Sequence, residues 1–357
     1  MRNNNEEIAE KALVIKIAID MHLRSYRVVR QIEHGRPQPA QKFGVEAFYQ
    51  WLAKQRGMAQ RLVVCYEAGC FGYEPARRME AMGCEVLVVA PQKWDEAGKR
   101  QVNDRFDAQV MCHRLSEYLD GHRRTLSIVR IPSREEEARR AQGRLREQVR
   151  RKLRQMQASG RSLMLQMGLA MKGRWWRGRT WERIQGQMPG WVVKQLECWK
   201  RLIEATEKEA LSLEQALEAA PKAKALLFGE GKLTHELMGR EVIDAGRFRN
   251  GRQVGNYFGL CPSESSSGES RHLGSITKHG NPRLRKLAVE MAWRVARFQP
   301  GYVAVRKWEP VLANPKASGA ARKKAIVALA RRLVVDLWRI STGRISALEL
   351  GLKLKVA

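Results

Sequence analysis

Residues 13–19 read LVIKIAI, an apolar and β-branched run that ends at Asp20. Such a run is typical of a buried strand, and a second run over residues 26–30 predicts a hairpin with it. Strands alternating with helices indicate an α/β domain, which we place at residues 1–132. Its further strands are predicted over residues 61–66 and 85–90, and its helices over residues 43–54, 75–82 and 103–119.

The pattern becomes helical from residue 133 onward. Ser133 precedes three glutamates, a typical helix start, and the helix then turns basic up to residue 161. A second helix is expected over about residues 192–220. The pair favours an antiparallel coiled-coil hairpin over residues 133–220, although a plain helical bundle has the same pattern.

Residues 221–357 are expected to form a mostly α-helical C-terminal domain. Its best-defined helix covers residues 283–296, where apolar side chains recur three and four residues apart. Another basic helix is predicted over residues 319–338.

The composition indicates a polyanionic partner. The 357 residues include 66 Lys and Arg against 37 Asp and Glu, a net charge of +29, which most often means nucleic acid. No apolar run reaches about 18 residues, so no contact with a membrane through a spanning helix is expected. The start of the chain resembles no secretory signal, and six scattered cysteines favour reduced thiols in a cytoplasmic protein over a zinc site.

Four acids follow the predicted α/β elements in order. Asp20 and Glu67 end two strands, and Asp104 and Asp107 stand three residues apart on a helix, where both carboxylates share one face. Hard oxygen ligands of this kind suit Mg²⁺, which supports phosphoryl transfer. A surface charge or helix cap explains any one acid by itself, and we expect His22 to be structural.

The stretch GLCPSESSSGESRHLGSITKHGN at residues 259–281 is rich in Ser and Gly and is predicted to be a loop. Such a loop before a helix can hold a phosphate, with Lys278, Arg283 and Arg285 adding charge. An activated serine in it could attack a phosphodiester. The alternative is a flexible, solvated loop.

The two motifs together resemble one family of insertion-sequence transposases over nearly the whole chain. In that family a RuvC-like DEDD domain with an RNase H-like fold precedes a coiled coil and a serine transposase domain. Its members are bridge-RNA-guided recombinases, related to pilin-gene invertases. Asp20, Glu67, Asp104 and Asp107 match the DEDD set. The second motif is matched by Gly259, Leu260, Pro262, Ser267, Gly268, Gly274, Lys278, Gly280 and Asn281.

The resemblance implies a mechanism and partners. Ser267 would be the catalytic serine, with Ser265 or Ser266 as alternatives, forming a covalent phosphoserine link during DNA strand exchange. The four acids would be catalytic Mg²⁺ ligands. The implied partners are donor and target DNA, a non-coding bridge RNA, and further copies of the chain, as a dimer that becomes a tetramer on DNA.

Two further segments are predicted to bind nucleic acid. Tryptophans interleaved with arginines can stack on bases, and a helix face rich in arginine can follow a phosphate backbone. Packing at a hairpin tip and a solvated charged face are the alternatives. These residues are Arg139, Arg140, Arg144, Arg150, Arg151, Arg154, Arg174, Trp175, Trp176 and Arg177.

Two other functions remain open. A structure-selective nuclease of the RuvC type, such as a junction resolvase, would need the four acids and not Ser267. A non-catalytic nucleic-acid scaffold would need neither.

Overall fold

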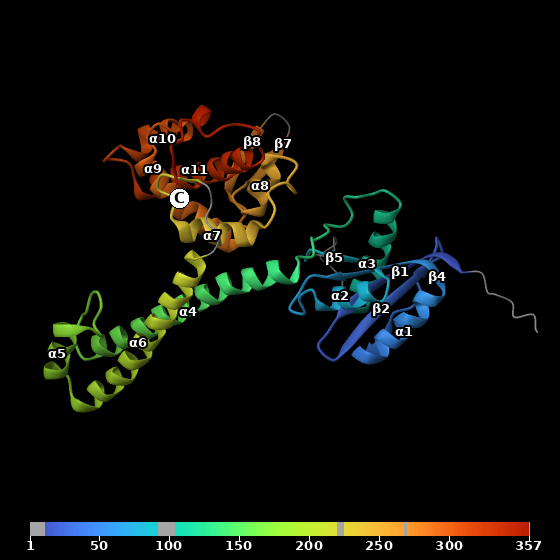
Figure 1. Ribbon diagram of the computed structural model, residues 1–357, viewed down its shortest axis with the longest axis horizontal. Coiled ribbons are helices and arrows are strands. Elements are labelled where there is room, and N and C mark those ends of the chain that lie inside the picture. Colours follow the sequence, from blue (N-terminus) through green and yellow to red (C-terminus); the bar gives the residue numbers. More distant parts are fainter. Residues whose placement is uncertain (1–10, 92–103, 220–224, 268–269, 357) are drawn as a thin grey trace, which may run out of the picture. The chain divides into compact units, whose positions relative to one another are not determined.

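The computed structural model describes residues 11–91, 104–219, 225–267 and 270–356 (Figure 1). The chain divides into two compact units, Met1–Ser133 and Arg134–Ala357, called unit 1 and unit 2 below. No helix in these described ranges combines the length and apolarity needed to cross a membrane.

Unit 1 is built on a mixed sheet. Its strands lie in the order β3-β2-β1-β4-β5; β2 is antiparallel to both β1 and β3, while β4 is parallel to both β1 and β5. The predicted hairpin and the strands near residues 61–66 and 85–90 are confirmed. The strands are β1 (Ala12–Met21), β2 (Ser25–Ile32), β3 (Gln41–Gly44), β4 (Ala59–Glu67) and β5 (Glu85–Val89). Strand β3 was not predicted, because four mostly polar residues are too short to show a period.

Both faces of this sheet are covered, which explains the continuous apolar run in β1. Ile15, Ile17 and Ile19 are buried with side chains of α1 and α2, whereas Ala18 packs with side chains of α3 on the opposite face. The helices are α1 (Val45–Gly57), α2 (Glu74–Ala81) and α3 (Asp104–Leu119).

Unit 2 begins with a helical hairpin, in which α4 and α6 run side by side and α5 lies at one end (Figure 1). Helix α6 buries a side chain at every seventh residue, which is the spacing of a seam between paired helices. Those residues are Leu196, Ile203, Ala210 and Leu217. The helices are α4 (Arg134–Gln166), α5 (Gly178–Gln187) and α6 (Gly190–Glu218).

The remainder of unit 2 is mostly helical and has its own core. The predicted face of α9 is confirmed, since Leu284, Ala288, Met291, Ala292 and Val295 are all buried. The helices are α7 (Lys232–Val242), α8 (Gly251–Tyr257), α9 (Pro282–Phe298), α10 (Val303–Leu312), α11 (Gly319–Ser341) and the short η1 (Leu348–Leu350). The strands are β6 (Ala225–Leu227), β7 (Pro262–Ser267), β8 (Ser270–Ile276) and β9 (Leu354–Val356).

The sequence predicts a loop over residues 259–281, and for most of this segment that prediction is wrong. Strands β7 and β8 form an antiparallel hairpin there. Its side chains are largely polar and exposed, so backbone pairing defines the strands and no apolar alternation marks them in the sequence.

Asp336 is the buried charge that we expect to matter most for the stability of this core. It is fully buried and accepts hydrogen bonds from the Tyr302 hydroxyl at 2.7 Å, Arg332 Nε at 2.7 Å and Arg339 Nη1 at 3.1 Å. Replacing it with Ala leaves the buried Tyr302 hydroxyl without its acceptor, whereas the partly exposed Arg332 and Arg339 can turn to solvent, so the change should cost about 1–3 kcal/mol. Hydrogen exchange of the α11 amides would measure the loss. Exchange as slow as in the unchanged protein would contradict it.

His235 should make the stability of the start of α7 depend on pH. Its Nδ1 lies 2.9 Å from an oxygen of the buried Glu230, and this hydrogen bond raises the pKa of His235 above its ordinary 6.5. A raised folded-state pKa gives stability that is fully present below about pH 6.5 and is lost as the pH rises through the folded value. Thermal melts across that window should therefore show a fall that His235→Gln removes. An equal fall in the variant would contradict the assignment.

Candidate active site

The carboxylates of Asp20 and Glu67 leave neighbouring strands at matching positions. Strands β1 and β4 pair in parallel, with Ile19 opposite Tyr66, so the next residue on each strand is one of these acids. Each acid is partly exposed. The parallel pairing therefore brings two strand ends with carboxylates to the same edge of the sheet.

Both acids belong to the face of the sheet that α3 covers. Ala18 and Cys65, two residues earlier on each strand, are buried with α3. Because side chains alternate along a strand, Asp20 and Glu67 are expected on that same face.

Helix α3 runs antiparallel to β1. Near the middle of α3, Cys112 is hydrogen-bonded to the backbone of Ala18, and one turn later Ser116 accepts a 2.7 Å hydrogen bond from the buried Lys16 Nζ. Higher residue numbers on α3 thus lie beside lower residue numbers on β1. The first turn of α3 therefore lies toward the end of β1 that carries Asp20.

Asp104 and Asp107 occupy that first turn. Asp107 stands four residues before Met111, which is buried against the sheet, so it shares the helix face that covers the sheet. The side chain of Asp107 is partly exposed. The side chain of Asp104 lies outside the described residues. Among the described side chains, Asp20, Glu67 and Asp107 thus belong to elements that meet at one end of the β1–β4 pair.

His22, which the sequence predicts to be structural, lies beside one of these acids. Its Nε2 lies 3.1 Å from Asp20 Oδ2, and its side chain is 46% exposed. A ring this exposed adds little to the core, and it contacts a predicted metal ligand. The two-residue spacing along the strand was the signal for this pairing.

The donor chemistry of this edge fits a magnesium ion. Mg²⁺ is commonly held by one or two carboxylates together with waters and substrate phosphate. Asp20 and Glu67 supply such oxygens at an open strand edge. Among the side chains that the structure describes, no three of the His, Cys, Asp and Glu type gather closely enough to hold a metal by themselves.

Ser267 lies at the end of β7, at the tip of the β7–β8 hairpin, opposite Ser270. Its side chain, like that of Ser266, lies outside the described residues. Ser265, the other serine alternative with a described side chain, is exposed and pairs with His272 of β8.

The glycines of the second motif build the base of this hairpin. Gly259 has a φ of +65°, which favours glycine. A Cβ at Gly280 would lie 2.5 Å from the carbonyl oxygen of Asn256 and 2.5 Å from the Gly259 nitrogen. The segments on either side of the hairpin therefore approach so closely that only glycine fits.

Asn281 joins the hairpin to the rest of unit 2. Its side-chain oxygen caps α9 by accepting from the backbone N–H of Arg283 at 3.0 Å and of Leu284 at 3.3 Å. Its Nδ2 donates to Glu241 at 2.8 Å, and Arg144 of α4 donates twice to the same carboxylate at 3.0 and 3.1 Å. Burial favours the neutral acid, but Arg144 and Asn281 hold the pKa of Glu241 below its usual value.

The basic residues around the hairpin have different surroundings. Lys278 is exposed and has a φ of +58°, and its carbonyl accepts a hydrogen bond from Arg285 Nη1 at 3.1 Å. Arg283 Nε instead lies 2.6 Å from Glu147 Oε2 of α4. Lys278 is therefore better presented to a partner than Arg283.

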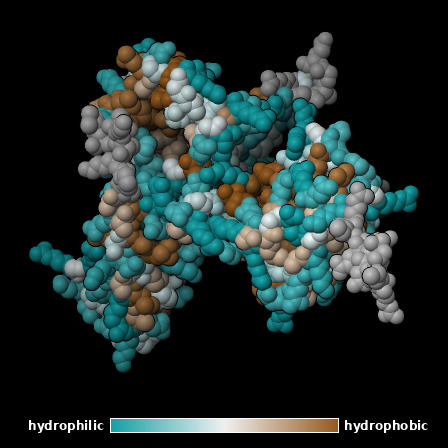
Figure 2. Space-filling view, turned by 45° about the vertical axis from the view of Figure 1, so that its right-hand side comes forward, coloured by the Kyte–Doolittle hydropathy of each residue, from teal (hydrophilic) through white to brown (hydrophobic). Residues whose placement is uncertain are grey.

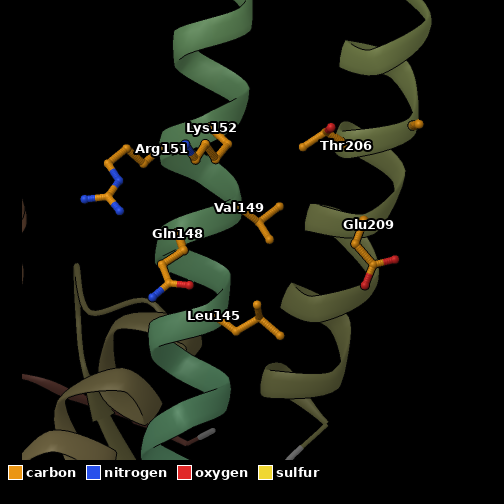
Figure 3. Close-up of a pocket in the computed structure, with 8 residues that line it drawn as sticks. Leu145, Gln148, Val149, Arg151, Lys152, Thr206 and Glu209 are labelled. Atoms are coloured by element: carbon orange, nitrogen blue, oxygen red, sulfur yellow. The ribbon is translucent and has the colours of Figure 1, made fainter. Parts of the chain in front are cut away.

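Several arginines predicted to follow a phosphate backbone are paired within the chain. Arg139 lies 3.2 Å from Glu236, Arg144 bonds Glu241 and Arg150 lies 2.6 Å from Glu214. Arg151 and Arg154 are exposed, and Arg151 points away from α6 in Figure 3, while Arg140 is half-buried.

The two predicted stacking tryptophans pack inside the hairpin. Trp175 is fully buried and Trp176 is 2% exposed. A Cβ at Gly160 would lie 2.0 Å from the Trp175 ring, so that glycine lets the ring lie against α4. Trp176 Nε1 donates to Glu207, which Arg177 also contacts at 2.7 Å. As they lie, these rings are not open to a base, and packing accounts for them; Arg174 remains exposed.

Comparisons with known proteins relate these features to transposases. Residues 227–305 match the model of the transposase family described as IS116/IS110/IS902. A putative transposase of Sinorhizobium fredii, y4qE, is 30% identical over 303 residues, which cover 79% of this chain and 76% of that protein. The transposase for insertion sequence element IS1328 of Yersinia enterocolitica is 25% identical over 341 residues, covering 92% of this chain and 97% of that protein.

Proposed function

Because the chain belongs to the IS116/IS110/IS902 family of transposases, we propose that it moves its insertion sequence by a serine-based, Mg²⁺-dependent and RNA-guided exchange of DNA strands. The observation that carries the proposal is the pairing of two built sites in one chain. In unit 1, Asp20 and Glu67 end adjacent parallel strands, and in unit 2 Ser267 ends β7 at the tip of a hairpin.

The proposed reaction exchanges one phosphate ester bond for another, so strands can be rejoined without an external energy source. The Ser267 Oγ–phosphorus bond forms as the bond from phosphorus to the leaving sugar oxygen breaks. The serine proton is lost and the leaving oxygen takes up a proton. The reverse reaction with another sugar hydroxyl rejoins a strand. Mg²⁺, when bound, would stabilise negative charge on the phosphate oxygens.

The residues of unit 1 would bind and orient this phosphate. Asp20 and Glu67 would be the ion's ligands from adjacent strands, and Asp104 and Asp107 would complete the set from α3. His22 would orient the Asp20 carboxylate through the 3.1 Å contact. The mixed sheet covered by helices on both faces supports an RNase H-like domain for unit 1.

The hairpin of α4 and α6 supports the proposed coiled coil and oligomer. Besides the seven-residue seam, it exposes Leu145, Leu202 and Leu211, which are 47%, 47% and 55% exposed. Hydrophobic residues are visible along the hairpin surface in Figure 2. Leu145 and Val149 point from α4 toward α6 into a groove of about 480 Å³ (Figure 3). A second copy would cover such apolar surface, and oligomers could bring acids and serine from different copies together.

A covalent adduct tests the proposal. Purified protein is incubated with Mg²⁺, RNA transcribed from the flanks of its element, and labelled donor and target DNA, and the products are separated on a denaturing gel. A slow, protease-sensitive DNA band is expected. Free cleaved ends without such a band would favour the hydrolytic nuclease instead.

A further inference from the structure

A basic pocket lies between α4, α7 and α9. Its walls include five cationic side chains and the carboxylates of Glu147 and Glu241. The cationic residues are Arg140, Arg146, Arg240, Arg283 and Lys286. Cations thus outnumber carboxylates in the lining.

Three of these cations already have carboxylate partners. Arg283 pairs with Glu147, Arg240 lies 2.7 Å from Glu236, and Arg146 bonds Glu214. The Arg283–Glu147 pair joins α9 to α4, whereas the Arg240–Glu236 pair lies within α7 and the Arg146–Glu214 pair joins α4 to α6.

Arg140 and Lys286 also have carboxylate neighbours, Glu241 and Glu290, but their donors are less fully used. Arg140 Nε is buried and has no hydrogen-bond partner among the described residues. Lys286 is 50% exposed and lies 3.9 Å from Glu290, too far for a hydrogen bond. A buried donor without a partner is costly, and Arg140 also lines the pocket, so a ligand with acceptor oxygens there would meet a guanidinium whose donors are not all used.

We propose that this pocket binds a backbone phosphate of a nucleic acid, with Arg140 and Lys286 as its ligands from opposite walls. A phosphodiester offers several acceptor oxygens and a negative charge, which match a guanidinium and an ammonium. The net charge of +29 suits such a partner. The inference rests on the proposed nucleic-acid function and adds a specific anchoring site to it.

The site would place the backbone close to the serine hairpin. Glu241 lines the pocket and also holds Asn281, the cap of α9 at the end of the hairpin's return segment. A phosphate anchored here would therefore lie against the same framework that supports β7 and β8. Such a contact positions a strand without reading its sequence.

Salt titrations of the full chain test the site. Fluorescence anisotropy measures binding of labelled single-stranded RNA and of labelled duplex DNA, each of mixed sequence, over a range of salt concentrations. Arg140→Gln and Lys286→Gln should each weaken binding to every sequence tested and reduce the slope of log K against log[salt] by about one, for at least one of the two probes. Lys307→Gln, an exposed lysine of α10, is the matched control and should behave like the unchanged protein.

The outcomes separate this inference from the proposed function. Slopes that Lys286→Gln and Arg140→Gln leave unchanged for both probes, while the unchanged protein binds with a steep slope, would overturn the pocket alone. Binding by the unchanged protein that does not depend on salt would overturn both. Because Lys286 is half-exposed, its variant should fold even if Arg140→Gln does not.

Discussion

Ser267→Ala should abolish the covalent protein–DNA adduct and reduce strand exchange by on the order of 10³-fold or more, because the nucleophile is lost. Binding of RNA and DNA should stay unchanged, since the substitution removes one hydroxyl at the tip of the hairpin. Denaturing gels with labelled DNA measure the adduct, and anisotropy measures binding.

Ser275→Ala is the matched control for this experiment. It removes an exposed hydroxyl from the partner strand β8 and should leave the adduct intact. An adduct that persists in Ser267→Ala but disappears in Ser265→Ala or Ser266→Ala would move the nucleophile to that residue of β7. An adduct lost in none of Ser265→Ala, Ser266→Ala and Ser267→Ala would mean that attack by one of these three serines is wrong.

Much of unit 1 could be predicted from the sequence because its strands are buried on both faces. The run at residues 13–19 and the segments that became β4 and β5 are apolar enough to be found individually. Parallel pairing then follows from the intervening helices, and it brings Asp20 beside Glu67.

The serine hairpin could not be found in the same way. Its strands are largely polar and exposed, and the close approach of Gly280 to Asn256 joins segments that flank the hairpin. The glycines and serines therefore predicted a loop. In the structure, Gly259 and Gly280 instead allow the segments that flank the hairpin to pack closely. The close packing that requires these glycines becomes evident only in the folded structure.

The nucleic-acid-binding side chains were hard to predict for a different reason. The sequence shows that a residue is charged or aromatic but not which residue it contacts. Arg144 meets Glu241 across 97 residues of sequence, and Trp175 is buried against Gly160 within its own hairpin. The many arginines of α4 predict a nucleic-acid-binding face. Some of them instead form ion pairs that join α4 to α6 and α7. Arg140 stands out only after those pairs are assigned.

Asp20→Asn should reduce the Mg²⁺-dependent cleavage of DNA by on the order of 10³-fold, because several kcal/mol of charge stabilisation at the phosphate is lost and each 1.36 kcal/mol is about tenfold in rate. The amide keeps the shape of the side chain and an oxygen for His22, so folding and nucleic-acid binding should persist. Glu80→Gln, an exposed acid of α2 outside the predicted set, is the matched control. Cleavage rates are measured over a range of Mg²⁺ concentrations.

The adduct connects the two sites of the proposed mechanism. If the acids stabilise the phosphate that Ser267 attacks, Asp20→Asn must slow adduct formation as much as it slows cleavage. Adduct formation at the unchanged rate in Asp20→Asn would mean that the serine works without the acids. The carboxylates of unit 1 would then belong to a separate hydrolytic reaction, in which β1 and β4 hold a metal that the serine does not need.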